Sequence, residues 1–380
     1  MLSLIRVFSI QVTFCFSRTN TFCNMISDSH LKRGHTKNSS DNSDTAKKSA
    51  MVKKIGTHNG TFHCDEALAC FLLRLLPEYE DSTIIRTRDS EKLATCDVVV
   101  DVGGVYDPST FRFDHHQRSF NESMSSLNSS KKWTTKLSSA GLVYYHFGER
   151  IIQNVLKCGK EDNKIVTTIF DKVYERFIEE IDGIDNGINQ CECTPKYIIS
   201  TNLSGRVSHL NPLWNCSDTN EEDQFKKAME LVGSEFLERV TFYKNSWIPA
   251  RKIVKQAIEE RYEIDKSGEV LLLKNGGCPW KDHLLSLEQE MDISPKIKYV
   301  LFTDQNGCWR ILCVPVELGS FTNRLSLPEE WRGLRNEELS EKSGIKGCVF
   351  VHAGGFIGGN KTYDGIIEMA QVALAQKRDE

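Results

Sequence analysis

Hydrophobic positions after residue 51 follow two alternating patterns, one typical of strands and the other of helices. Short apolar runs at 83–88, 97–102 and 111–113 predict strands, and residues 53–56 predict a fourth. One helical face then carries a set of apolar residues that ends before Pro77: Ala67, Leu68, Phe71, Leu72, Leu75 and Leu76. Because the run 97–102 is apolar inside without interruption, it indicates a parallel strand covered on both faces, as in an α/β fold.

Further along the chain, the patterns predict a helical connector and a second, smaller α/β domain. Apolar residues alternate three and four positions apart between Glu221 and Tyr262, which is typical of a helix that packs along another. Strand patterns return at 270–273, 298–302, 309–314 and 348–351, before a helix from about Asp364. We therefore expect a transit peptide and linker over 1–50, a catalytic domain with a parallel sheet over 51–215, the connector over 216–262 and a substrate-binding domain over 263–380.

The composition fits a soluble intracellular enzyme. The chain has 380 residues, of which 39% are hydrophobic and 26% charged, so it can bury the cores of two ordinary domains. Its formal net charge of -4 argues against a protein that coats nucleic acid by bulk attraction. The 13 cysteines form no evident pairing framework, which indicates reduced thiols. No segment is long and apolar enough to span a bilayer, so no membrane association is expected.

The first 27 residues have the composition of a mitochondrial transit peptide. They contain Arg6 and Arg18, no acidic residue, and apolar residues interspersed with Ser and Thr. A weak secretory signal and a disordered start without an address are the alternatives, and the unpaired cysteines count against secretion. Residues 28–50 are polar and predict a disordered linker. The pairs Lys47-Lys48 and Lys53-Lys54 give weak support to nuclear entry.

Histidines and carboxylates gather where the predicted strands end. His58, His63 and Asp65 lie on a strand-to-helix loop, Asp101 ends the run 97–102, and Asp114-His115-His116 follows the strand at 111–113. Open α/β sheets bind ligands at the carboxyl ends of their strands, so we expect these side chains to converge. Imidazole and carboxylate together suit a borderline divalent metal, Mn²⁺ above all and Mg²⁺ as the alternative. Ligands from several loops indicate a catalytic metal site.

A later helix supplies two further candidate ligands. Apolar residues four apart carry this helix to Ile181, and it ends at Asp182-Gly183-Ile184-Asp185. Either Asp182 or Asp185 is a candidate for the last metal ligand, and a solvated helix cap is the alternative for both. For the other candidate ligands, the alternative to metal binding is a structural role, as a histidine of the core or as a carboxylate in a salt bridge. The convergence of five such residues on strand ends favours the metal site.

Candidate substrate contacts follow the histidines and recur near the C-terminus. Residues 117–132 predict a loop that closes over the site as a lid, followed by a basic and aromatic cluster that includes Trp133 and Lys136. A solvated loop with one anchoring tryptophan is the alternative. Ser138 and Ser139 open the next helix. A predicted strand, glycine-rich turn and helix can hold phosphate on backbone N–H groups, with an ordinary tight turn as the alternative; its residues are His352, Gly354, Gly355, Gly358 and Gly359.

The triplet Asp114-His115-His116, the loop before it and the isolated Asp101 resemble the DHH phosphoesterase superfamily, which includes RecJ-type single-strand exonucleases and manganese pyrophosphatases. Five longer motifs resemble the melanocyte proliferating gene family of exonucleases: GTHNGTFHCDE at 56–66, DVGG at 101–104, DHHQRSF at 114–120, LSSAGL at 137–142 and VHAGGFIGG at 351–359. The similarity runs from about Lys54 to the C-terminus. It implies a 3′–5′ exoribonuclease that processes RNA in mitochondria and the nucleus.

The resemblance also implies roles for single residues in a two-metal hydrolysis. One ion would be held by His58, His63 and Asp101, and the other by Asp65, Asp101, His115 and either Asp182 or Asp185. Asp101 would bridge two ions about 3.5–4 Å apart. His116 would contact the scissile phosphate, with Asp114 and Arg118 as further catalytic residues. His63 stands where the superfamily usually has an aspartate, which removes one negative charge and favours Mn²⁺ over Mg²⁺.

Two other functions fit the same residues. One is a small-molecule phosphoesterase that cleaves pyrophosphate, a dinucleotide or a cyclic nucleotide, because the metals would serve either substrate. The other is a non-catalytic RNA-binding scaffold with a vestigial site, which is weakened because every matched ligand type is chemically competent. Single-stranded DNA is a second candidate substrate beside RNA. The oligomeric state is not predicted.

Overall fold

The structure is a computed structural model that describes residues 52–216 and 219–376. The predicted transit peptide and the linker up to residue 50 lie outside the described residues. Two separate sheets form within this part of the chain, each with its own hydrophobic core. The fold is α/β, as predicted from the alternation of strand and helix patterns.

The first sheet has the strand order β2-β1-β3-β5-β4. Its strands are β1 (Lys54–Thr57), β2 (Thr83–Arg86), β3 (Val98–Val100), β4 (Tyr106–Asp107) and β5 (Arg112–Phe113). β1 is parallel to β2 and β3, and β3 is parallel to β5; only β4 runs antiparallel to its neighbour. The carboxyl ends of β1, β3 and β5 therefore meet at one edge of the sheet, as the sequence predicts.

Helices cover the two faces of this sheet unequally. On the thicker side, Ile55, Val98 and Phe113 share a core with residues of α1 (Cys64–Arg74), α4 (Ser139–Leu156), α5 (Asn163–Val173) and α8 (Glu221–Phe242). On the other side, Val99 packs with Leu93 and Cys96 at the short helix α2 (Ser90–Ala94). Because successive strand residues point to opposite faces, a strand covered on both sides has to be apolar throughout, as β3 is.

Shorter elements fill the connections between these helices. They are η1 (Pro108–Thr110), α3 (Met124–Leu127), η2 (Lys160–Asp162), the π-helical turn η3 (Tyr174–Ile178), α6 (Glu179–Asp185) and α7 (Leu203–Ser208). The predicted loop after the histidines contains α3. The predicted helix that ends near Asp185 is interrupted by η3, and the extra residue of a π turn changes which side of the helix faces the core.

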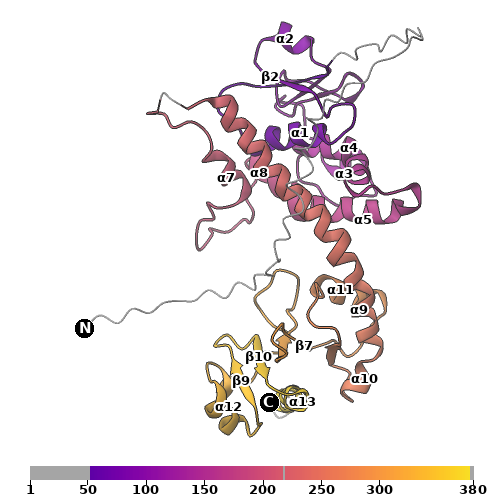
Figure 1. The fold of residues 1–380 in the computed structure, drawn as a ribbon, viewed down its shortest axis with the longest axis vertical. Coiled ribbons are helices and arrows are strands. Elements are labelled where there is room, and N and C mark those ends of the chain that lie inside the picture. Colours follow the sequence, from indigo (N-terminus) through magenta and orange to yellow (C-terminus); the bar gives the residue numbers. More distant parts are fainter. Residues whose placement is uncertain (1–51, 217–218, 377–380) are drawn as a thin grey trace, which may run out of the picture. The chain divides into compact units, whose positions relative to one another are not determined.

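A long helical segment leads from the first sheet to the second. It comprises α8, the π-helical turn η4 (Tyr243–Trp247), α9 (Ile248–Glu259) and α10 (Arg261–Ile264), and Figure 1 shows α8 beside α1 and continuing into α9. The apolar residues that predicted this segment are buried in the first core: Phe225, Met229, Val232, Phe236, Val240 and Tyr243. These residues are helical and face a core, as predicted, and the role of the segment as a connector between two domains stays a prediction.

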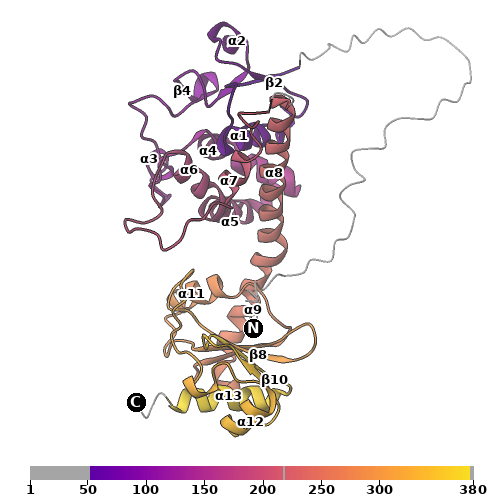
Figure 2. The ribbon, with the colours of Figure 1, turned by 90° about the vertical axis from the view of Figure 1, so that its left-hand side faces the viewer.

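The second sheet has the order β6-β7-β8-β10-β9 and lies between two helical layers. Its strands are β6 (Val270–Leu273), β7 (Tyr299–Thr303), β8 (Trp309–Cys313), β9 (Cys348–Val351) and β10 (Ile357–Asn360). Only β6 and β7 pair in parallel. The remaining helices are α11 (Lys281–Glu290), η5 (Glu329–Trp331), α12 (Asn336–Ser343) and α13 (Tyr363–Gln376), and Figure 2 shows α13 alongside β10.

Strand β6 shows how the second sheet is buried. Val270 and Leu272 belong to the core formed with α12 and α13, whereas Leu271 and Leu273 belong to the core formed with α9 and α11. All four residues are buried, which explains the uninterrupted apolar run. The strands predicted for this part of the chain are confirmed, with boundaries that differ by a residue.

The predicted glycine-rich turn is only partly correct. Gly354 and Gly355 lie in the turn between β9 and β10, where Gly355 has φ +65° and donates its N–H to the carbonyl of His352. Gly358 and Gly359, however, are buried residues of strand β10, so their placement in the turn is wrong. A Cβ atom at Gly358 would lie 3.1 Å from Leu327 and from Val351, so these glycines allow close packing within the sheet.

Among the described residues, no helix combines the length and the hydropathy needed to cross a bilayer. The long segment formed by α8 and α9 is rich in charged residues.

The close approach of α4 and α5 yields a test of this packing. A Cβ at Gly148 would lie 2.8 Å from the buried ring of Phe170, which stacks on Tyr144. Overpacking of this kind costs about 1–3 kcal/mol, whereas alanine improves helix propensity by only about 1 kcal/mol. We expect Gly148→Ala to lower the free energy of unfolding, as measured by urea denaturation.

The matched control for Gly148→Ala is Gly183→Ala in α6, where the nearest atom to a new Cβ, in Thr135, lies 4.0 Å away. This variant has the helix-propensity benefit without the clash, so we expect it to be neutral or stabilised. Equal destabilisation of the two variants would contradict the packing described for α4 and α5.

Candidate metal centre

The ends of three parallel strands bring the predicted histidines and carboxylates together. His58 follows β1, Asp101 follows β3, and Asp114-His115-His116 follows β5. Asp101 has φ +58°, in the left-handed region that non-glycine residues seldom occupy. Backbone strain of this kind is maintained where the surrounding structure needs a side chain in one particular direction.

The carboxylate of Asp101 lies between two imidazoles. Its Oδ2 is 3.3 Å from His58 Nε2, and its Oδ1 is 3.3 Å from His115 Nε2. All three side chains are almost completely buried. A carboxylate that presents each oxygen to a different histidine has the arrangement expected of a ligand shared by two metal ions.

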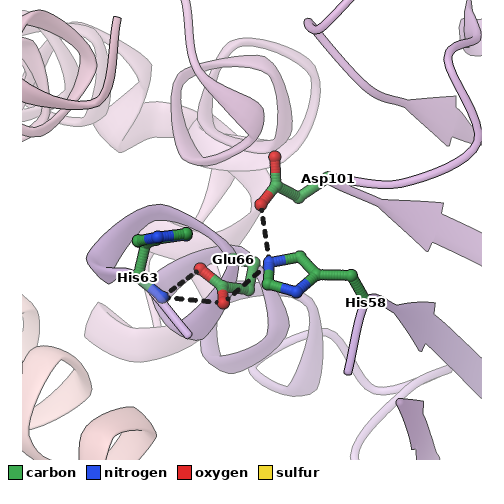
Figure 3. A group of neighbouring side chains, drawn as sticks. All are labelled: His58, His63, Glu66 and Asp101. Carbon is green, nitrogen blue, oxygen red and sulfur yellow. Dashed lines mark hydrogen bonds and ion pairs between the residues drawn. The ribbon is translucent and has the colours of Figure 1, made fainter. Parts of the chain in front are cut away.

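One ligand group forms around His58. It consists of His58, His63, Glu66 and Asp101, whose nearest ligand atoms all lie within 4.8 Å of one another. Figure 3 shows His58 between Asp101 and Glu66, with His63 at the start of α1. Glu66 Oε1 is 3.1 Å from His58 Nε2, and both Glu66 oxygens accept the backbone N–H of His63.

A second ligand group forms around His115. Asp65, His115 and Asp185 have ligand atoms within 4.8 Å of one another, and so do Asp101, His115 and His116. His115 Nε2 lies 3.1 Å from Asp185 Oδ2. The set with His116 shares Asp101 with the group around His58 and His115 with the set that contains Asp65, so the residues predicted for two ions converge on one place.

Asp65 is the strongest sign that this place is built for cations. The residue is completely buried at the start of α1, and neither carboxylate oxygen receives a hydrogen bond from the described residues. Burial raises the pKa of Asp65 well above its usual value, and the nearby charges of Asp101 and Asp185 raise it further. An unpaired buried carboxylate costs several kcal/mol, and a divalent cation would offset that cost, so the residues fit a metal.

The two buried histidines have unusual pKa values because of the same crowding. Burial by itself would lower the pKa of His58, but hydrogen bonds with Asp101 and Glu66 raise it to about 10. Burial would also lower the pKa of His115, but hydrogen bonds with Asp101 and Asp185 raise it to about 10. Each imidazole thus lies in a strongly negative environment, where a positive charge is stabilised.

Outer hydrogen bonds orient both imidazoles. His58 Nδ1 lies 3.2 Å from the carbonyl oxygen of Asn59, and His115 Nδ1 lies 3.2 Å from Asn186 Oδ1. Asn186 is itself held, because its amide donates to the carbonyl oxygens of Lys136 and Asp182. On His115, a proton on Nδ1 donated to Asn186 leaves Nε2 with a lone pair for a metal. His58 Nδ1 also lies 3.4 Å from the Arg88 guanidinium, which is a donor.

Asp114 and His116 form a pair beside the two groups. Asp114 accepts hydrogen bonds from His116 Nδ1 at 2.8 Å, from the backbone N–H of His116 at 3.1 Å and from the N–H of Gly104 at 2.6 Å. Asp114 is buried, whereas the His116 side chain is 62% exposed. The pair therefore leaves Nε2 of His116 available to a substrate while Asp114 fixes the ring.

Asp182 lies apart from the histidines. It is completely buried, and its carboxylate accepts hydrogen bonds from the Ser138 N–H and hydroxyl and from the Tyr174 hydroxyl. Of the two alternatives left by the sequence, only Asp185 lies in a ligand group. We therefore treat Asp185 as the candidate ligand and Asp182 as a structural residue.

The predicted contacts that follow the histidines differ in their exposure to solvent. Ser138 and Ser139 are completely buried; Ser138 binds Asp182, and the Ser139 hydroxyl donates to Asp101 Oδ1 at 3.3 Å. They lie beneath the site, so a substrate does not reach them. Lys136 is half-buried with its ammonium over the Phe120 ring, and Arg118 is exposed next to the histidines.

The basic and aromatic cluster after the predicted lid has internal partners. Lys131 pairs with Asp171 and Lys132 pairs with Glu175, while Trp133 is 9% exposed and packs edge-on against Tyr174. This arrangement corresponds to the alternative of a loop anchored by one tryptophan.

The candidate contacts from the second sheet stay separate from the metal centre. Among the described residues, those lining the cavity beside the histidines all precede residue 210. His352 is exposed in the β9–β10 turn, and its Nδ1 accepts the N–H of Gly354 at 2.9 Å. Its role in holding substrate remains a prediction.

Glu66 and Asn186 are candidate functional residues that the sequence reasoning did not assign. Glu66 stands three residues after His63, the spacing of a helix capping box, so its sequence signal is that of a cap. Asn186 directly follows Asp185 at the end of α6. The sequence indicates a function only weakly at both positions, because polar residues at helix ends commonly cap the helix.

Comparison with known proteins identifies relatives along nearly the whole described chain. Residues 54–374 match the family MYG1_exonuc, described as an uncharacterised protein family, UPF0160. The chain belongs to the MYG1 exonuclease family. It is 58% identical over 325 residues to the MYG1 exonucleases of Rattus norvegicus and Homo sapiens, covering 85% of this chain and 85% and 86% of theirs.

More distant members of the MYG1 family include the MYG1 protein of Saccharomyces cerevisiae. It is 44% identical over 337 residues, which cover 86% of this chain and 97% of the yeast protein. No solved structure matches the chain. Family membership supports a nuclease role, and the resemblance noted from the motifs is thereby confirmed at the level of the family.

The different placement of Asp185 and Asp182 leads to a paired prediction. Asp185→Asn removes a charged candidate ligand. Loss of a residue that only hydrogen-bonds to a ligand lowers metal affinity roughly 10–100-fold, so this variant should lose more than that. Asp182→Asn keeps a hydrogen-bonding side chain of the same size and should retain metal binding. Titration of each variant with Mn²⁺ by calorimetry measures both effects, and the reverse order would refute the assignment.

The pH dependence of stability provides an independent check on Asp182. Burial raises its pKa to about 7, although hydrogen bonds from Ser138 and Tyr174 lower it. The folded protein therefore holds a proton that the unfolded chain releases near pH 4, so this group makes stability fall as pH rises from about 4 to about 7. The melting temperature of Asp182→Asn should therefore fall less between about pH 4 and about pH 7 than that of the unaltered protein, as melting curves recorded across this range would show.

Proposed function

We propose that this protein is a metal-dependent 3′–5′ exoribonuclease of the DHH phosphoesterase superfamily, a hydrolase of RNA phosphodiester bonds. The observation that carries the proposal is the position of Asp101 between two histidine and carboxylate groups beside the unpartnered Asp65. The exonuclease names of the mammalian relatives support a nuclease. The RNA substrate and the 3′–5′ direction come from the motif resemblance.

The candidate ligands divide into two sets that share Asp101. His58, His63, Glu66 and Asp101 would hold one ion. Asp65, His115 and Asp185 would hold the other, together with Asp101, which lies 3.3 Å from His115. Divalent ions bound here would supply Lewis-acid chemistry, making water a better nucleophile at neutral pH and offsetting charge on phosphoryl oxygens. We propose Mn²⁺ as the preferred ion, with Mg²⁺ as a weaker substitute, because both sets mix imidazole with carboxylate.

The protein's own groups orient the reacting phosphate. His116 lines the cavity, and its hydrogen bond with Asp114 raises its pKa. As an imidazolium it would donate from Nε2 to a non-bridging oxygen of the scissile phosphate. Asp114 keeps the ring in that direction through the 2.8 Å bond to Nδ1. Asn186 and the carbonyl of Asn59 hold His115 and His58 so that their Nε2 atoms face Asp101. Arg118 is exposed nearby and would attract the phosphate backbone.

Purified full-length protein tests the activity directly. It would be dialysed against chelator, reloaded with Mn²⁺ or Mg²⁺ and given RNA labelled at either end, single-stranded DNA or pyrophosphate. We expect no hydrolysis without metal, recovery with Mn²⁺ above Mg²⁺, and early release of mononucleotide from 3′-labelled RNA. The variant Asp101→Asn, which removes charge from the shared ligand, should lose activity by several orders of magnitude.

Three outcomes would decide against the proposal. Unchanged hydrolysis in excess chelator would exclude the metal centre. Hydrolysis of pyrophosphate in preference to RNA would favour the small-molecule phosphoesterase. Binding of RNA without hydrolysis of any substrate, with every metal offered, would favour the scaffold alternative.

We also propose that the protein acts in mitochondria and the nucleus. The support is the acid-free, arginine-containing segment 1–27 and the motif resemblance. A fluorescent reporter fused to residues 1–27 should enter mitochondria, and replacement of Arg6 and Arg18 by glutamine should keep it in the cytosol. A reporter that stays cytosolic with the unaltered segment would refute the mitochondrial part.

A further inference from the structure

A cavity of about 550 Å³ adjoins the candidate metal centre. His63, Asp101, His116 and Asp185 form one wall, so a molecule in the cavity would be in contact with the ligand groups. Cavities of this size hold ligands of the dimensions of cofactors and nucleotides. The other walls therefore indicate which part of a substrate extends away from the metals.

The far walls combine an apolar surface with short polar side chains. Ile184 and Ile199, which are 41% and 54% exposed, provide the apolar surface, whereas the Phe62 side chain is completely buried. Helix α7 and the residues around it add hydroxyl groups and one imidazole, among them Ser204, Ser208 and His209. A nucleoside has complementary chemistry, because its base offers a flat apolar face and its ribose offers hydroxyls that donate and accept hydrogen bonds.

The charge of the lining argues against a second phosphate in this space. Among the described residues that line the cavity, none is lysine or arginine, and the carboxylates all belong to the metal centre. Phosphate groups are normally held by arginine, lysine or a metal. An uncharged occupant beyond the metals is therefore favoured over the remainder of a pyrophosphate or polyphosphate.

The wall formed by α7 is held in place by the surrounding structure. Asn202 caps the helix by accepting the N–H of Gly205 at 2.7 Å, and Leu203 and Val207 are buried. Asn211, just beyond the helix, accepts the N–H of Phe62 at 2.9 Å and donates to its carbonyl at 2.8 Å. These bonds join the two sides of the cavity, so it is formed before a ligand arrives.

From these observations we propose that the cavity is the subsite for the terminal nucleoside of the substrate, with the scissile phosphate at the metal centre. The base lies against Ile184 and Ile199, and the ribose meets the hydroxyls and the imidazole around α7. The inference rests on the proposed function and deepens it, because space for one nucleoside beside the metals accounts for removal of one nucleotide at a time.

Binding experiments test the subsite without relying on catalysis. Full-length Mn²⁺-loaded protein is titrated with adenosine 5′-monophosphate and with inorganic phosphate. We expect the nucleotide to bind at least tenfold more tightly, and we expect Ser208→Phe, which adds a ring at an exposed position of the lining, to remove most of that difference. His209→Ala should reduce it less and guards against a folding defect in the larger variant.

The matched control is Thr201→Phe, which adds the same ring at an exposed neighbouring position outside the cavity lining. It should keep the preference for the nucleotide. Kinetics supply a second readout: Ser208→Phe should lower kcat/KM for an oligoribonucleotide at least tenfold more than for methyl p-nitrophenyl phosphate, which has no nucleoside.

The outcomes separate the subsite from the proposed function. Equal affinity of the unaltered protein for nucleotide and phosphate would overturn the subsite, as would an unchanged preference in both Ser208→Phe and His209→Ala. A protein that prefers the nucleotide but hydrolyses no phosphodiester would retain the subsite and refute the exonuclease.

Discussion

The crowding of buried carboxylates at one edge of the first sheet is the constraint on which the site depends. Asp65, Glu66 and Asp101 are almost inaccessible to solvent, and Asp185 lies beside them. The nearest groups able to carry a compensating charge are the imidazoles of His58, His115 and His116 and the Arg88 guanidinium, which lies 3.4 Å from His58 Nδ1. Ionised carboxylates this close together are unfavourable in the protein interior unless cations bind them, so the arrangement makes sense as a place for metal ions.

The surrounding structure keeps these groups together. The loop from His58 to His63 is held from three directions: the Gly60 N–H donates to Glu221, the Gly60 carbonyl accepts from Arg86, and Asn211 binds both backbone groups of Phe62. Arg86 is a completely buried guanidinium that also pairs with Glu221 at the start of α8. The first turn of the long helix therefore braces the metal loop, which links the connecting segment to the chemistry.

Much of the fold and of the centre could be predicted because strong local patterns agreed with the tertiary structure. The apolar run around Val99 indicated a strand covered on both faces, and the parallel order then required His58, Asp101 and His115 to meet at one edge. The family resemblance supplied the roles that spacing could not.

The parts that could not be predicted depend on contacts between distant residues. Asp182 and Asp185 differ in role because a π-helical turn and the partners Ser138 and Tyr174 determine which one faces the core. The sequence predicted a turn at Gly358 and Gly359, yet they lie in strand β10, paired with β8 and β9, where neighbouring residues leave little room for a side chain. Glu66 was not assigned from the sequence, because its spacing from His63 is that of a helix cap and capping and metal binding use the same carboxylate.

Diffraction from crystals grown with Mn²⁺, recorded on both sides of the manganese absorption edge, tests the central claim most directly. The account predicts two anomalous peaks, one on each side of the Asp101 carboxylate, with the first near His58 and Glu66 and the second near Asp65, His115 and Asp185. Crystals that diffract well but show no peak beside Asp101 at saturating Mn²⁺ would contradict it.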